Sequence, residues 1–320
     1  MQFYGQSVIL GMEVIVPMKV LLTRLPVPVG CVALGLIGLA VLLSGYSTLF
    51  LWIFGLCSIL LQLLLVLKCC LPGQLRTACG DCVTLSTLAG YSMALMLTSV
   101  QLKTFLPYAA AFVLWCCGLL LHLIIIVLFS RKLLRERPSA FAARGSWLLV
   151  YVGIAAASIS ASAFGANAIG RILLIPAALG ALILVPLILR AELKSSDIPV
   201  AQKPLFCIIA APVSIWICGY FGSVPECSRT LVAVLLPLSQ LFYLLGLWCF
   251  IKTCRQPFSP AFAAFTFPFV ISATALKKSC VFLGCSGAFR VLIPLEILIA
   301  LAGCLFAFFG YFRFLLMKRA

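Results

Sequence analysis

The chain has 320 residues, of which 64% are hydrophobic and only 9% are charged. A soluble domain cannot bury so large an apolar fraction, so the composition indicates an integral membrane protein and excludes a large soluble catalytic domain. The formal net charge is +16. Because the Lys and Arg residues lie between apolar runs, this charge favours membrane orientation and contact with anionic lipid headgroups over nucleic-acid binding.

Residues 1–25 are expected to form a cytoplasmic segment that lies on the membrane surface. Glu13, Pro17 and Lys19 interrupt the apolar run of this segment, which is unlike a cleavable signal peptide. Residues 26–320 are predicted to form one transmembrane domain.

Ten apolar runs follow the N-terminal segment, and each approaches the roughly 20 residues that a helix needs to cross a bilayer. We expect all ten to be helical, because an open strand edge would leave backbone groups unpaired in lipid. The predicted spans are Pro28–Ser44, Ser47–Leu67, Cys82–Gln101, Phe105–Phe129, Ser146–Ala166, Ile172–Leu189, Leu205–Gly222, Thr230–Ile251, Ala261–Leu276 and Val291–Leu316.

Lys and Arg residues are concentrated in the N-terminal segment, in the loops after even-numbered spans and at the C-terminus. The densest cluster follows the fourth span and contains Arg131, Lys132, Arg135, Arg137 and Arg144. Basic loops favour the cytoplasmic side of a membrane. The sequence therefore predicts a multi-pass protein of the cell membrane with both termini in the cytoplasm.

Odd-numbered spans are rich in small and hydroxyl residues, whereas even-numbered spans are rich in leucine. The stretch AAASISASAFGA (155–166) of the fifth span contrasts with LLQLLLVL (60–67) of the second. Leucine suits lipid contact, and small residues let helices approach closely or line a polar path. One interpretation is five helical hairpins, with an inner ring of odd helices around a central pore and an outer ring of even helices. The other is that small residues mark only close helix packing.

The ninth span is unlike a lipid-facing helix. The stretch SPAFAAFTFPFVISATAL (259–276) sets four phenylalanines among small residues, with a proline in its middle. Proline removes a backbone hydrogen bond and kinks a helix. The seventh span carries a similar pattern, P-x-F followed by a second proline at the same distance, over Pro204–Pro212 and Pro260–Pro268. The residues predicted to line a pore are Phe265, Thr266, Pro268, Pro212, Gly30, Gly35, Ser158 and Ser160.

No Asp, Glu, Lys, Arg or His residue lies inside an odd-numbered span. A path lined by these spans is therefore neutral, which favours a passive route over a proton-coupled pump, since buried charges in membranes usually mark proton relays. His122 in the fourth span is expected to be hydrogen-bonded between helices, with a proton sensor as the alternative. Glu296 in the tenth span is expected to pair with Arg290 or Lys277 near the surface, with a functional role as the alternative.

Sixteen cysteines raise the question of a metal or redox site. Cys79 and Cys82 have zinc-ligand spacing, but the cysteine pair at 69–70 is a poor second half of such a site, so no metal or cofactor is predicted. A single histidine and scattered acidic residues argue against haem and metal-diphosphate chemistry, so we do not expect an enzyme. Two of three cysteines on the predicted outer side could form a disulfide: Cys227, Cys280 and Cys285.

Three stretches resemble the tellurite-resistance/dicarboxylate transporter family, which includes bacterial TehA and the slow-type anion channels of plant guard cells. They are PVPVGCVALGLIGLA (26–40), Pro138-Ser139 before the fifth span, and AFTFPFVISATA (264–275). The resemblance implies a homotrimer in which each subunit has its own pore, formed by five inner helices. It also implies that Phe267 occludes the pore and that the substrate is chloride, nitrate or a C4-dicarboxylate such as malate.

Two other functions are compatible with the residues alone. A drug/metabolite-type carrier of a small organic solute also has ten helices, built as two inverted halves of five. A non-transporting membrane anchor subunit would need neither a transport path nor a residue that closes it.

Overall fold

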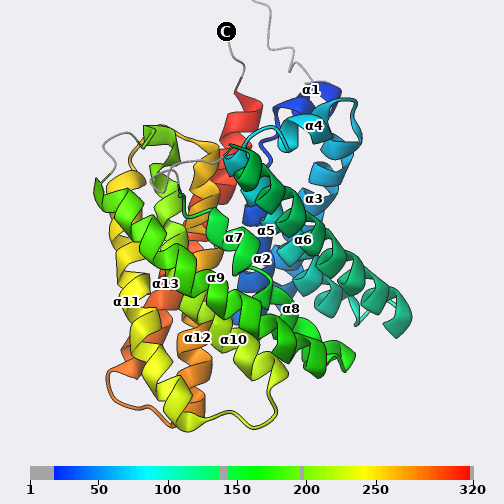
Figure 1. The fold of residues 1–320 in the computed structure, drawn as a ribbon. Helices are drawn as coiled ribbons and strands as arrows, with labels where there is room; N and C mark the ends of the chain where they lie inside the picture. The colour runs from blue at the N-terminus through cyan, green and yellow to red at the C-terminus, as the bar shows by residue number, and fades with distance from the viewer. Residues whose placement is uncertain (1–17, 137–142, 195–197, 318–320) are drawn as a thin grey trace, which may run out of the picture.

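The computed structural model describes residues 18–136, 143–194 and 198–317, and every regular element in these ranges is helical (Figure 1). The Pro138-Ser139 stretch and most of the N-terminal segment lie outside them. The helices, with 3₁₀ helices marked η, are α1 (Met18–Arg24), α2 (Val29–Ser44), α3 (Thr48–Cys70), α4 (Gln74–Ala78), α5 (Cys82–Leu102), α6 (Tyr108–Glu136), α7 (Trp147–Tyr151), α8 (Ala155–Ser160), η2 (Ala161–Phe164), α9 (Asn167–Lys194), η3 (Val200–Ala210), α10 (Pro212–Ser223), α11 (Arg229–Thr253), η4 (Pro260–Phe265), α12 (Phe267–Leu283) and α13 (Phe289–Leu316).

Eight segments of the described chain are long and apolar enough to cross a membrane, or nine if the bent pair α1–α2 is one span. Burial separates them into two groups. In the most apolar 18 residues of α5, of η3–α10 and of η4–α12, 67%, 78% and 83% of the residues are buried. In α3, α6, α9, α11 and α13 the values lie between 28% and 33%. The helices poor in leucine are therefore inside the bundle, and the leucine-rich helices expose one broad apolar face.

Four of the ten predicted spans are not single long helices, namely the first, fifth, seventh and ninth. The first corresponds to α2, which has 16 residues and meets α1 at an angle of 89° because Pro26 and Pro28 separate the two helices. The fifth is divided into α7, α8 and η2. At its first break Gly153 donates to the carbonyl of Leu148, five residues back, and Ala155 donates to that of Val152, three residues back. The regular four-residue ladder is lost there.

The two P-x-F…P stretches fold in the same way. Each runs as a 3₁₀ helix that ends at the second proline or just before it, and an α-helix begins there: η3 gives way to α10 at Pro212, and η4 gives way to α12 at Phe267. A proline nitrogen cannot donate to the preceding turn, and it is tolerated in the first turn of a helix. The sequence repeat is thus a structural repeat.

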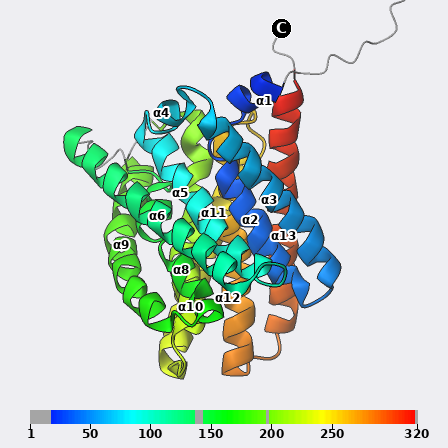
Figure 2. The ribbon, with the colours of Figure 1, turned by 90° about the vertical axis from the view of Figure 1, so that its right-hand side faces the viewer.

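Each buried segment packs against the exposed helix that follows it, as in the pairs α2–α3, α5–α6, α8–α9, α10–α11 and α12–α13. The buried segments also pack against one another: α2 against α5, α5 against α7 and α8, α8 against α10, α10 against α12, and α12 against α2. The start of α1 and the end of α13 lie at the same end of the bundle, together with α4 (Figures 1 and 2).

Candidate functional site

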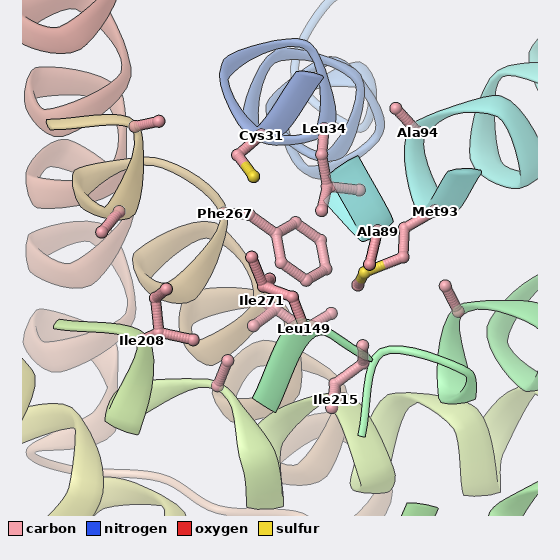
Figure 3. Packing of buried hydrophobic residues seen from close by; sticks show 14 of the residues in the cluster. Cys31, Leu34, Ala89, Met93, Ala94, Leu149, Ile208, Ile215, Phe267 and Ile271 are labelled. Atoms are coloured by element: carbon pink, nitrogen blue, oxygen red, sulfur yellow. The ribbon is translucent and has the colours of Figure 1, made fainter. Parts of the chain in front are cut away.

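Phe267, the first residue of α12, lies at the middle of the buried segments. Only 2% of its surface is exposed. Its ring is surrounded by side chains from α2, α5, α7, η3 and α10, among them Leu34, Met93, Leu149 and Ile208 (Figure 3). Each neighbour comes from a different element, so a single ring contacts much of the inner surface of the bundle.

Two narrow cavities flank this ring. The first is lined by residues of α2, η3 and η4, and the second by residues of α5, α7 and α10. Phe267, Leu149 and Ile208 line both of them. Each has a volume of about 10 Å³, which is close to the minimum for one water molecule. The three side chains therefore form a constriction between two spaces that are themselves tight.

A wider cavity opens from the first narrow one toward the end of the bundle that carries α1 and α4. Its volume is about 410 Å³, and it shares Thr87, Leu205 and Pro260 with the narrow cavity. Arg24, Lys68 and Asp81 also line it, so its wall carries a net positive charge. We call this space the vestibule. Shared lining residues place the vestibule next to the first cavity, and the first cavity next to the second, with Phe267 between the last two.

Thr266 anchors the residue before Phe267. Its hydroxyl group is within hydrogen-bond distance of two carbonyl oxygens, that of Ala263 at 2.8 Å in the preceding turn and that of Cys31 at 3.0 Å on α2. Gly35 faces Thr266 from α2, and a side-chain carbon at Gly35 would collide with the Thr266 side chain and lie 3.0 Å from the backbone nitrogen of Phe267. The backbone that carries the ring is therefore clamped directly against α2.

A stripe on α12 leads away from Phe267 on the side opposite the vestibule. Ile271, Thr274 and Lys278 follow Phe267 at intervals of three or four residues, so they share one helix face. Exposure rises along this face from buried Ile271 through half-buried Thr274 to exposed Lys278, although most neighbouring positions of α12 are buried. The Sγ atom of Cys218 on α10 lies 4.0 Å from the carbonyl oxygen of Ile271, and α10 and α12 pack against each other.

The residues predicted to line a pore fall into two groups. Pro268 lines the first narrow cavity and Pro212 the second. The others contact neighbouring helices. Phe265 meets Phe250 of α11 with ring centroids 4.9 Å apart, Gly30 lies against Tyr91, and Gly35 and Thr266 contact each other. The Ser158 hydroxyl donates to the carbonyl of Gly170 on α9, and the Ser160 hydroxyl accepts from the Trp115 indole.

Sequence reasoning missed Leu149 and Ile208. Both are ordinary aliphatic residues in apolar helices, so composition cannot separate them from lipid-facing positions. The proline repeat did contain a usable signal. Superposing Pro212 on Pro268 places Ala211 where Phe267 stands, and Ala211 lines the second cavity. The equivalent positions of the two repeats, Ala211 and Phe267, therefore line the same cavity.

Two polar residues outside this path test further predictions. The nitrogens of His122 lie 2.8 Å from the Ser92 hydroxyl of α5 and 3.0 Å from the Val150 carbonyl of α7, which confirms the interhelical role. The predicted ion pair of Glu296 is wrong: its carboxyl group is fully buried, and within the described residues neither oxygen has a hydrogen-bond partner. The three outer cysteines, Cys227, Cys280 and Cys285, are free thiols.

The arrangement is better suited to the passage of a solute than to catalysis. The walls of both narrow cavities are apolar apart from Thr87 and the backbone, and no charged side chain lines them. Within the described ranges, no group of three or more His, Cys, Asp or Glu residues is placed to hold a metal ion. The buried segments together form a basic vestibule, a closed constriction and a neutral wall.

Comparison with known proteins agrees with this description. No curated protein matches the chain. The family described as voltage-dependent anion channel (SLAC1) matches residues 24–312, which is nearly the whole chain and confirms the resemblance inferred from its motifs. The chain therefore belongs to the voltage-dependent anion channel family, as a multi-pass membrane anion channel or transporter and not an enzyme.

Proposed function

We propose that the protein passes small anions, namely chloride, nitrate or a C4-dicarboxylate such as malate, along a neutral pore that Phe267 closes. One observation carries the proposal: Phe267 lines both narrow cavities, one on each side of its ring. Rotation of this one side chain would join the two spaces. Phenylalanine has few rotatable bonds and a large apolar ring, so it makes a compact plug that requires no charge.

The contacts among the buried segments support a pore formed by an inner ring. α2 packs against α5, α5 against α7 and α8, α8 against α10, α10 against α12, and α12 again against α2, which is a closed cycle. The five predicted odd-numbered spans supply these segments. The leucine-rich helices that follow each of them would then form the outer ring, and their exposed apolar faces suit lipid or a neighbouring subunit.

Charge at the two ends of the path supports anions as the substrate. Arg24 and Lys68 line the vestibule, and Lys278 is exposed at the far end of the Phe267 stripe. Basic groups at a pore mouth raise the local concentration of anions. Between these ends a neutral wall would bind an anion weakly enough to release it, which conduction requires.

Orientation and assembly complete the proposal. The vestibule would face the cytoplasm, because the predicted cytoplasmic loops hold most of the Lys and Arg residues. Both termini would lie on that side of the cell membrane. The resemblance to TehA and the guard-cell channels favours a homotrimer with one pore in each subunit.

Anion substitution in liposomes tests the proposal. The purified chain is reconstituted, and efflux of chloride, nitrate and malate is compared with that of an uncharged organic solute and with that of empty liposomes. The proposal predicts anion efflux above the control and none of the uncharged solute. Efflux of the uncharged solute alone would favour a drug/metabolite-type carrier, and no efflux from either the wild type or a Phe267→Ala variant would contradict a conducting role.

A further inference from the structure

A buried polar cluster lies between α11, α12 and α13, away from the narrow cavities. Glu296 of α13 is its centre: none of its surface is exposed, and neither carboxyl oxygen has a hydrogen-bond partner among the described residues. The carboxamide of Gln240 on α11 lies beside it, yet the Gln240 nitrogen has no hydrogen-bond acceptor within the described part of the chain. The hydroxyl of Tyr243, one turn further along α11, is also buried with no partner in those ranges.

Among the described residues, no cationic side chain forms an ion pair with Glu296. Two titratable groups act on it electrostatically, the Tyr243 phenol from α11 and the Cys280 thiol from α12, and both are neutral in their ordinary state. Only one salt bridge joins side chains of the described residues, and it lies elsewhere, between Lys132 and Glu136. Among the described residues, an ionised carboxylate in such a place would have no counter-ion.

The cost of desolvation determines whether this packing accommodates the ionised or the protonated form of the Glu296 carboxyl group. Burying an unpaired carboxylate costs far more than burying a neutral acid, and inside a membrane no water offsets that cost. A neutral acid instead brings a hydroxyl proton that a carboxamide oxygen such as that of Gln240 can accept, and its carbonyl oxygen can accept from a donor such as the Gln240 amide or the Tyr243 hydroxyl. The closed packing therefore suits a carboxyl group with its proton bound.

The cluster touches the helix that carries the plug. The Tyr243 ring meets the Phe269 ring edge to face, with centroids 5.8 Å apart. Phe269 is fully buried and stands two residues after Phe267 on α12. Loss of the proton from Glu296 would leave a charge that only a looser, wetter arrangement of these helices could solvate. Such loosening would change the packing against α12, the helix that carries Phe267.

We propose that Glu296, Gln240 and Tyr243 form a buried proton-binding site behind the helix that carries Phe267, with Glu296 protonated while the helices are packed as in this structure. Coupling of this site to conduction rests on the proposed function; proton binding itself does not. Release of the proton to water leaves one negative charge on Glu296 and favours the open arrangement.

Infrared spectroscopy of the reconstituted full chain tests proton binding without any measurement of transport. The wild type is expected to show a protonated-carboxyl band at neutral pH that disappears on alkaline titration. The band should be absent from Glu296→Gln and present in Glu226→Gln, the matched control for an exposed outer-loop glutamate. Tyr243→Phe keeps the ring on Phe269 and should shift the band, which supplies a second reading if Glu296→Gln does not fold. A wild type without the band, or a band unchanged in both Glu296→Gln and Tyr243→Phe, would overturn the proposal.

Anion current tests the coupling. Wild-type current should rise as pH increases, because ionised Glu296 disfavours the closed packing, and this rise should be lost in Glu296→Gln and kept in Glu226→Gln. A rise that persists in Glu296→Gln would overturn the coupling. If no variant conducts anions while the carboxyl band behaves as described, the proposed anion function fails and the proton site stands.

Discussion

Gly35 of α2 has no room for a side chain because Thr266, the residue before Phe267, occupies that space. The Thr266 Oγ1 atom would lie only 2.6 Å from a side-chain carbon at Gly35, and the backbone nitrogen of Phe267 would lie 3.0 Å from it. The Thr266 hydroxyl is also 3.0 Å from the Cys31 carbonyl oxygen on α2. Glycine here lets α2 approach the η4–α12 junction and fixes the backbone from which the Phe267 ring projects.

Gly35→Ala is therefore expected to destabilise the protein. The methyl carbon would collide with the Thr266 Cβ atom, which no rotamer change can move, and overpacking of this kind costs about 1–3 kcal/mol. Thermal unfolding in detergent, followed by tryptophan fluorescence, measures the effect. Gly45→Ala is the control, since only the flexible end of Lys277 lies within 4 Å of a side-chain carbon there. Equal melting temperatures for the two variants would contradict the close packing of Gly35 against Thr266.

Leu149 and Ile208 also form the constriction. Truncating either side chain should widen the constriction less than removing the Phe267 ring does. Leu149→Ala and Ile208→Ala each remove part of the wall that borders both cavities, so each should raise anion current modestly. Combined with Phe267→Ala, neither should add its full separate effect, because residues in contact are not additive. Single-channel recording of the single and double variants measures this. Fully additive effects would mean that the three side chains do not share one barrier.

Lys278 should attract anions to the mouth opposite the vestibule. Lys278→Gln removes its charge and is expected to lower anion current at low salt. The loss should shrink at high salt, since the Debye length falls from about 30 Å at 0.01 M to about 3 Å at 1 M. Arg290→Gln is the matched control, because Arg290 is an exposed cation outside the Phe267 stripe. A loss of equal size at both salt concentrations would point to a structural role instead.

The sequence predicted the main division of the fold. Leucine content separated buried from exposed helices because lipid contact rewards leucine, whereas closely packed helices need small residues. The paired prolines of Pro204–Pro212 and Pro260–Pro268 marked two helix breaks, since proline cannot continue the hydrogen-bond ladder. The break at Gly153 carried no such signal, as glycine is common within membrane helices.

Side-chain direction was harder to predict than span position. Ser158 and Ser160 satisfy their hydroxyl groups within the helix bundle, as most buried hydroxyls do. Hydroxyl content therefore overstated the polarity of the path. Leu149 and Ile208 border the plug only because α7 and η3 happen to present those faces, which composition does not encode. Glu296 was predicted near the surface from its position along the helix, and the neighbouring helices cover it.

The central claim is that Phe267 blocks the path. Phe267→Ala and Phe265→Ala each delete a buried ring, with packing losses of about 3–5 kcal/mol expected for both, but Phe265 lines neither narrow cavity. Anion conductance of the two variants at equal surface expression is the most direct test. We expect Phe267→Ala to raise conductance at least about tenfold, equivalent to a barrier lower by about 1.4 kcal/mol, and Phe265→Ala to leave it unchanged. Equal conductance in wild type and Phe267→Ala would contradict the account.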